Sequence, residues 1–157
     1  MFAAVLISAL TVHAEAATIS PIAEEQCITE KVIYYSDGSS LTISLWEYSP
    51  ITQWNSAASA SKSGSKSYTF KDSQGVSSWS IKLDASFTYN GTTAICKNSS
   101  VTVSVYNTSW TMLSKSAGKS GNTATGSCKM KFQSTPEKPK IYTKNLSISC
   151  SVDGILN

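Results

Sequence analysis

The side chains that most often carry chemistry are few in this 157-residue sequence. Its one histidine, His13, follows an apolar N-terminal run that we expect to be removed from the mature protein. Without an imidazole, neither a Ser-His-Asp nor a Cys-His centre can be built, and the usual zinc and copper sites lose their commonest ligand. No DxDxD-like run is present for calcium. The sequence therefore predicts neither a metal nor a cofactor.

A carboxylate pair or a Ser–Lys dyad is the enzymatic option that remains. The acidic candidates are Asp37, Glu47, Asp72, Asp84 and Asp153. Asp37, Asp72 and Asp153 lie in expected turns or at strand ends, where Asp commonly bonds its own backbone. Because side chains alternate between the two faces of a strand, Asp84 should face the solvent. We therefore expect a protein that is not an enzyme, and a carboxylate glycosidase is a distant alternative.

Three aromatic residues could form a sugar-binding platform. Because Leu41 and Leu45 have core parity, Trp46 and Tyr48 should face outward, and Trp54 follows shortly after. Flat aromatic faces stack on sugar rings, so these residues predict a carbohydrate-binding site. In the favoured alternative, a bulge near Trp46 turns the rings inward to cap the core.

The basic residues suggest a second kind of partner. All 13 of them are lysines, so the chain has no arginine guanidinium group to bind a phosphate through two hydrogen bonds. We therefore expect no nucleic acid as a partner. Lys129 and Lys131 share the outer face of one expected strand and could attract an anionic cell-wall polymer. The simpler interpretation is that these lysines protect a strand edge from aggregation.

Four cysteines, with no CxxC spacing, indicate structural disulfides in an exported chain. Asn90-Gly91 predicts a two-residue hairpin turn that places Cys96 opposite Ala85 on the core face. Cys128 and Cys150 also have core parity on their strands. Of the three connectivities that four cysteines allow, we favour Cys96–Cys150 together with Cys27–Cys128.

The candidate residues above lie on segments in which apolar and polar residues alternate, and turn residues separate these segments. They predict an all-β domain, an antiparallel β-sandwich for which immunoglobulin-like, Greek-key connectivity is preferred. Residues 55–67 are small, polar and without an apolar period, and we predict a flexible loop there.

The N-terminal segment indicates export. Residues 1–16 read as a signal peptide, with an apolar run and small residues before a cleavage site after Ala16, which leaves residues 17–157 as one secreted domain without a membrane anchor. The segment lacks Lys and Arg at its start, so a buried first element of the fold is the alternative.

We expect a secreted, non-catalytic binding or surface-interaction protein, and a carbohydrate or cell-wall polymer-binding module is the alternative within that class.

Residues 78–126 resemble a family of small secreted proteins of Gram-positive bacteria to which we attach no activity. The resemblance is carried by Trp79, the Phe87-Thr88-Tyr89-Asn90-Gly91 run, Cys96, Trp110, the Gly121-Asn122-Thr123-Ala124-Thr125-Gly126 run and Cys150. It implies an exported all-β domain and supports the pairing of Cys96 with Cys150. It implies no catalytic or binding residue.

Overall fold

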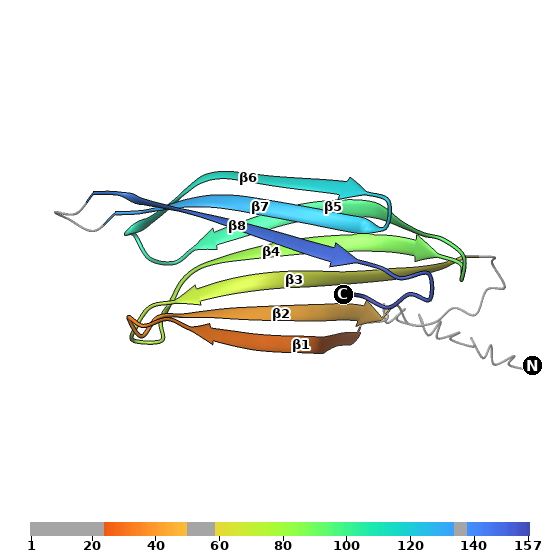
Figure 1. Cartoon of the computed structure of the whole chain (residues 1–157), viewed down its shortest axis with the longest axis horizontal. Helices are drawn as coiled ribbons and strands as arrows, with labels where there is room; N and C mark the ends of the chain where they lie inside the picture. The colour runs from red at the N-terminus through yellow and green to blue at the C-terminus, as the bar shows by residue number, and fades with distance from the viewer. Residues whose placement is uncertain (1–23, 50–58, 134–137) are drawn as a thin grey trace, which may run out of the picture.

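The computed structural model describes residues 24–49, 59–133 and 138–157, which form two antiparallel sheets packed face to face (Figure 1). The five-stranded sheet consists of β1 (Glu24–Tyr34), β2 (Ser40–Ser49), β3 (Ala60–Lys71), β4 (Ser77–Tyr89) and β5 (Ala94–Val105). The three-stranded sheet consists of β6 (Trp110–Ser120), β7 (Thr123–Phe132) and β8 (Lys140–Ser149). The predicted all-β class and the packing of two antiparallel sheets are confirmed.

The order of strands in each sheet is their order along the chain. A Greek key requires a strand that returns beside a non-consecutive neighbour, and every strand pairing in the described residues joins consecutive strands. The predicted Greek-key, immunoglobulin-like connectivity is therefore wrong. Tight turns explain the simpler order, since Gly38, Gly75 and Gly121 adopt positive φ angles and return the chain directly beside the preceding strand.

The core lies between the sheets and follows the predicted alternation. On β4, the side chains of Trp79, Ile81, Leu83 and Phe87 are at most 1% exposed. The facing residues of the three-stranded sheet are Trp110, Ala124, Cys128, Met130, Leu146 and Ile148. Full burial of one large apolar side chain contributes about 1.5–3 kcal/mol, so this layer is the main source of stability.

The two sheets approach most tightly at Gly126 on β7. A Cβ atom at this position would lie 2.6 Å from Cγ2 of Val101 and 3.3 Å from Cδ1 of Leu83. Only glycine fits this spacing without a shift of the neighbouring side chains. Gly126 therefore sets how closely β7 packs against β4 and β5.

Each end of the sandwich is closed differently. At one end, aromatic rings pack together across the sheets, with Trp110 5.3 Å from Phe70 and 5.0 Å from Phe132 between ring centroids. At the other end, the C-terminal residues fold back, and Leu156 is only 3% exposed. A Cβ atom on Gly64 would collide with Leu156, so the glycine makes room for this covering side chain.

The predicted flexible loop over residues 55–67 is wrong for residues 60–67, which form the first part of β3. Residues 55–58 lie outside the described residues, as does the proposed signal peptide. β3 lies between β2 and β4, and Ser65 pairs with Trp46 on one side and Asp84 on the other. Backbone pairing on both edges stabilises this segment although it lacks an apolar period.

The hairpin between β4 and β5 also differs from its prediction. Its loop has four residues, because Tyr89 pairs with Ala94 and Phe87 pairs with Cys96. Oδ1 of Asn90 accepts hydrogen bonds from the backbone N–H groups of Thr92 and Thr93, which stabilises the longer loop. The register moves by two residues, so Cys96 keeps the predicted core parity and is 5% exposed.

Candidate functional site

The outer side of the three-stranded sheet is a grid of short polar side chains, which we call the hydroxyl face. Its positions alternate along the strands with core residues such as Ala124 and Ile148. Across β6, β7 and β8 in turn, the rows are Ser120, Thr123 and Ser149; Gly118, Thr125 and Ser147; Ser116, Ser127 and Asn145; Ser114, Lys129 and Thr143; Thr111, Lys131 and Ile141. Hydroxyl groups dominate the first three rows, and the two lysines lie at one end of β7.

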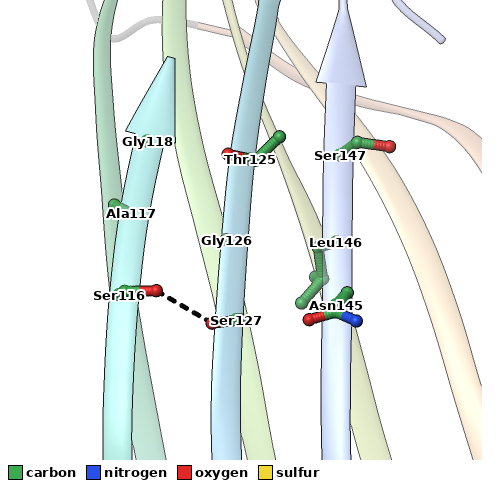
Figure 2. Close-up of a pocket in the computed structure, with 9 residues that line it drawn as sticks. All are labelled: Ser116, Ala117, Gly118, Thr125, Gly126, Ser127, Asn145, Leu146 and Ser147. Atoms are coloured by element: carbon green, nitrogen blue, oxygen red, sulfur yellow. Dashed lines mark hydrogen bonds between the residues drawn. The ribbon is translucent and has the colours of Figure 1, made fainter.

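A shallow, open depression of about 430 Å³ lies on this face, lined by residues of all three strands (Figure 2). Gly118 supplies no side chain, and Oγ1 of Thr125 lies beside it, 3.1 Å from where a Cβ atom would stand. The hydroxyls of Ser116 and Ser127 are hydrogen-bonded to each other at 2.8 Å. The Asn145 side chain adds an amide at the β8 side. The lining thus offers hydrogen-bond donors and acceptors without a charge.

The charge of this sheet is entirely of one sign. Its three strands contain six lysines and neither Asp nor Glu. Lys129 is exposed and Lys131 is half-buried, and neither takes part in the ion pairs Glu47–Lys62 and Lys82–Asp84, which both belong to the five-stranded sheet. The predicted lysine pair therefore lies on the same face as the hydroxyl rows.

The structure places the predicted aromatic residues on the outer face of the five-stranded sheet. Trp46 and Tyr48 are half-buried and lie outside the core cluster. The bulge expected near Trp46 lies instead in β1, between Cys27 and Thr29, while β2 pairs regularly with β3. The inward-turned alternative is therefore wrong. Trp54 lies outside the described residues.

The hydroxyl group and the ring of Tyr48 both contact residues of the five-stranded sheet. Its hydroxyl lies 2.8 Å from Oγ of the fully buried Ser65, and Nζ of Lys82 lies 5.4 Å from the centre of its ring. Nζ of Lys82 also lies 3.1 Å from Oδ1 of Asp84. The interaction with Tyr48, and then that with Asp84, raises the pKa of Lys82. The polar groups of Tyr48, Lys82 and Asp84 on this outer face are therefore already paired with one another or with Ser65.

The acidic candidates are dispersed, and Asp37 and Asp72 each have a local structural role. Oδ1 of Asp37 accepts two hydrogen bonds from Ser39, and the bond from its hydroxyl contributes most to lowering the pKa of Asp37. Oδ1 of Asp72 accepts bonds from the backbone N–H groups of Gln74 and Val76. These contacts stabilise turns. In the described residues, no group of three or more His, Cys, Asp or Glu side chains could hold a metal ion.

All four cysteines are free thiols in the structure. Cys27 is exposed on the outer face of β1, opposite Trp46, whereas Cys128 is enclosed between the sheets. These two thiols lie on opposite sides of the five-stranded sheet, so the predicted pairing of Cys27 with Cys128 is wrong. Burial raises the pKa of Cys96, Cys128 and Cys150.

Reasoning from the sequence missed the hydroxyl rows. The signal was present, since Thr123, Thr125 and Ser127 alternate with core residues along one strand. The rows become visible only when the neighbouring strands and their registers are known.

Among the described residues, no helix has the length and apolar character needed to cross a bilayer. No family model, no curated protein and no solved structure matches this chain. Its function must therefore be inferred from its own residues.

Proposed function

We propose that this protein is an exported, non-catalytic protein that binds an anionic, hydroxyl-bearing polymer, such as a cell-wall glycan, through the hydroxyl face. The observation that carries the proposal is the charge of β6, β7 and β8, which hold six lysines and no acidic residue. The two lysines on this face stand in line with rows of hydroxyl groups along β7. Lysines attract anionic groups at a distance, and hydroxyls can then donate to or accept from the hydroxyls of the polymer.

The face is also suited to a polymer by its shape. Its side chains are short, and its depression is open rather than enclosed. Enclosed sites suit small molecules, because such ligands must bury most of their surface to bind tightly. An extended chain can instead gain affinity from many weak contacts along a flat face.

The test compares retention of the protein on purified bacterial walls with retention on walls from which the anionic polymer has been extracted. We expect retention only on the intact walls and a decrease with added salt, because exposed charges are screened. Lys129→Gln combined with Lys131→Gln should weaken binding by about two- to thirtyfold, from the 0.2–1 kcal/mol typical of each exposed charge pair. Lys31→Gln on β1 is the matched control. Equal loss in the control, or retention that salt does not change, contradicts the proposal.

We also propose that export is accompanied by a disulfide between Cys96 and Cys150. The backbone N–H of Cys96 donates to the carbonyl of Gly121 at 2.8 Å, and that of Cys150 donates to the carbonyl of Asn122 at 3.0 Å. Both cysteine residues therefore flank the same turn, and both belong to the core cluster. In the reaction, the two thiols release two protons and two electrons, and the disulfide of a thiol–disulfide oxidoreductase is reduced to a dithiol.

Peptide mapping of the secreted protein without a reducing agent tests this bond. We expect one cross-linked peptide that joins Cys96 to Cys150, with Cys128 recovered as a thiol. A map in which Cys96 and Cys150 are both free, or are joined to other cysteines, excludes the pairing.

A second candidate is neutral carbohydrate binding at Trp46, favoured by the half-buried indole on the outer face of the five-stranded sheet. An indole face can stack on a sugar ring. The comparison is Trp46→Ala with Tyr106→Ala, since Tyr106 is 60% exposed and its hydroxyl lies 3.1 Å from Oγ of Ser80 on β4. Loss of binding to a neutral glycan array in Trp46→Ala alone supports this site, and an array without signal for the parent protein rejects it.

A further inference from the structure

Charge is distributed unevenly along the hydroxyl face. On β7, Lys129 and Lys131 occupy two adjacent rows, whereas the next three rows, at Ser127, Thr125 and Thr123, carry no lysine. The remaining lysines of these strands do not fill the gap. Lys115 and Lys144 pair with the inward-facing Cys128, and Lys140 pairs with Phe132 at the far end of β7. Nζ of Lys119 donates to the backbone carbonyl of Lys97.

The lysine-free part of the face is long compared with one sugar unit. From Ser127 to Thr123, β7 advances by four residue steps, or about 13 Å at 3.3 Å per step. The depression lies within this stretch, around Gly118, Thr125 and Asn145. A polymer with an anionic group on every unit would place at least one anion over this stretch, where the outward rows carry no lysine and the neighbouring Lys66 already donates to the carbonyl of Ser147 at 3.2 Å.

We propose that the hydroxyl face recognises a glycan in which an anionic group is followed by at least two neutral sugar units. The anion binds at Lys129 and Lys131, and the neutral units lie over the depression. There they exchange hydrogen bonds with hydroxyl groups and with the amide of Asn145. This inference deepens the proposed function and rests on it, because it names the charge pattern of the polymer that the same face binds.

The test measures the dissociation constants of three glycan hexamers by calorimetry at low salt. The probes are a neutral glucose hexamer, the same hexamer with one terminal phosphate, and a galacturonic acid hexamer, which carries a carboxylate on every unit. We expect the singly phosphorylated hexamer to bind best. Its advantage over the neutral hexamer should be about 1.4- to fivefold per lysine, the range for exposed charge pairs. Lys129→Gln with Lys131→Gln should remove this advantage.

Filling the depression separates the two parts of the site. Gly118→Val adds a side chain over the neutral rows, and the strand tolerates it because valine favours extended backbone and Thr125 is exposed and can move. We expect this variant to weaken binding of both glucose hexamers and to leave the effect of the phosphate unchanged. Thr102→Val is the control, since Thr102 is an exposed strand residue on the outer face of the five-stranded sheet, away from the hydroxyl face.

The possible outcomes distinguish this inference from the proposed function. Tightest binding of the galacturonic acid hexamer, with no effect of Gly118→Val, overturns the charge pattern but leaves an anion-binding face. Failure of all three hexamers to bind overturns both. Equal binding of the neutral and phosphorylated hexamers, insensitive to the lysine variants, overturns the role of the lysines.

Discussion

On the outer face of the five-stranded sheet, long side chains bind one another, whereas on that of the three-stranded sheet short hydroxyls surround a depression. Tyr48, Ser65, Lys82 and Asp84 are joined by a hydrogen bond, a cation–ring contact and an ion pair. On the hydroxyl face, the hydroxyls of Ser116 and Ser127 are bonded to each other, and Oγ1 of Thr123 donates to Oδ1 of Asn122. A face whose polar groups are already paired gains little from a ligand, whereas less engaged groups can exchange water for a partner.

The two sheets also differ in charge. The strands of the five-stranded sheet carry five acidic residues beside six lysines, whereas β6, β7 and β8 carry six lysines and no acidic residue. The net charge of +3 for the whole chain hides this separation. An anionic partner is therefore steered toward one side of the molecule.

The largest effect we predict concerns the position where the two sheets meet. Gly126→Val should lower the free energy of unfolding by about 1–3 kcal/mol or more, because the added carbons overpack the space beside Val101. Gly118→Val, on the same sheet but facing outward, should change it by less than about 0.5 kcal/mol, as is usual for surface positions. Urea unfolding of both variants measures the difference. Equal losses would show that the inner and outer sides of this sheet are not distinct.

The pH dependence of the free energy of unfolding distinguishes the buried thiol of Cys128 from the exposed thiol of Cys27. Burial raises the pKa of Cys128, so the folded chain retains its proton at a pH where the unfolded chain has lost it. This contribution to stability is fully present at neutral pH and is lost as the pH rises above about 8.5. Urea unfolding of the reduced protein between pH 7 and pH 10 measures the decline.

The exposed Cys27 provides the control for this measurement. Cys27→Ser should leave the alkaline decline unchanged, whereas Cys128→Ala should make it shallower. The same decline in all three proteins would contradict a role for the buried thiol.

The smallest effect tests the network on the outer face of the five-stranded sheet. Lys82→Gln removes the ion pair with Asp84 and the contact with the Tyr48 ring. We expect a loss of about 0.2–1 kcal/mol, because the pair is exposed. Lys129→Gln should cost nothing measurable, and thermal unfolding of both variants checks this. A larger loss in Lys129→Gln would reverse the comparison between the faces.

Local patterns in the sequence predicted the core strands well. The alternation from Trp79 to Phe87 fixed which side of β4 is buried, because successive side chains in a strand point to opposite faces. Parity also placed Cys96 and Cys150 in the core, although the loop after Tyr89 is two residues longer than predicted. A register error of two residues preserves the face on which each side chain lies.

What the sequence did not show depends on neighbouring strands. Residues 60–67 carry no apolar period, and their strand exists because β2 and β4 bond it from both sides. The hydroxyl face likewise combines residues from three strands, and its depression depends on Gly118 lying beside Thr125. Such features require the order and register of the strands, which single-strand patterns do not contain.

The meander order of the strands has a consequence for how the chain folds. Because every strand pairing within the two sheets joins consecutive strands, each pairing can form as a local hairpin, on a timescale of about 1–10 μs. Topologies rich in such local contacts fold faster than those that need distant strands to meet. We therefore expect hairpins to form early and the docking of the two sheets to limit the rate, so that Gly126→Val should alter the docking step and leave the early hairpins intact.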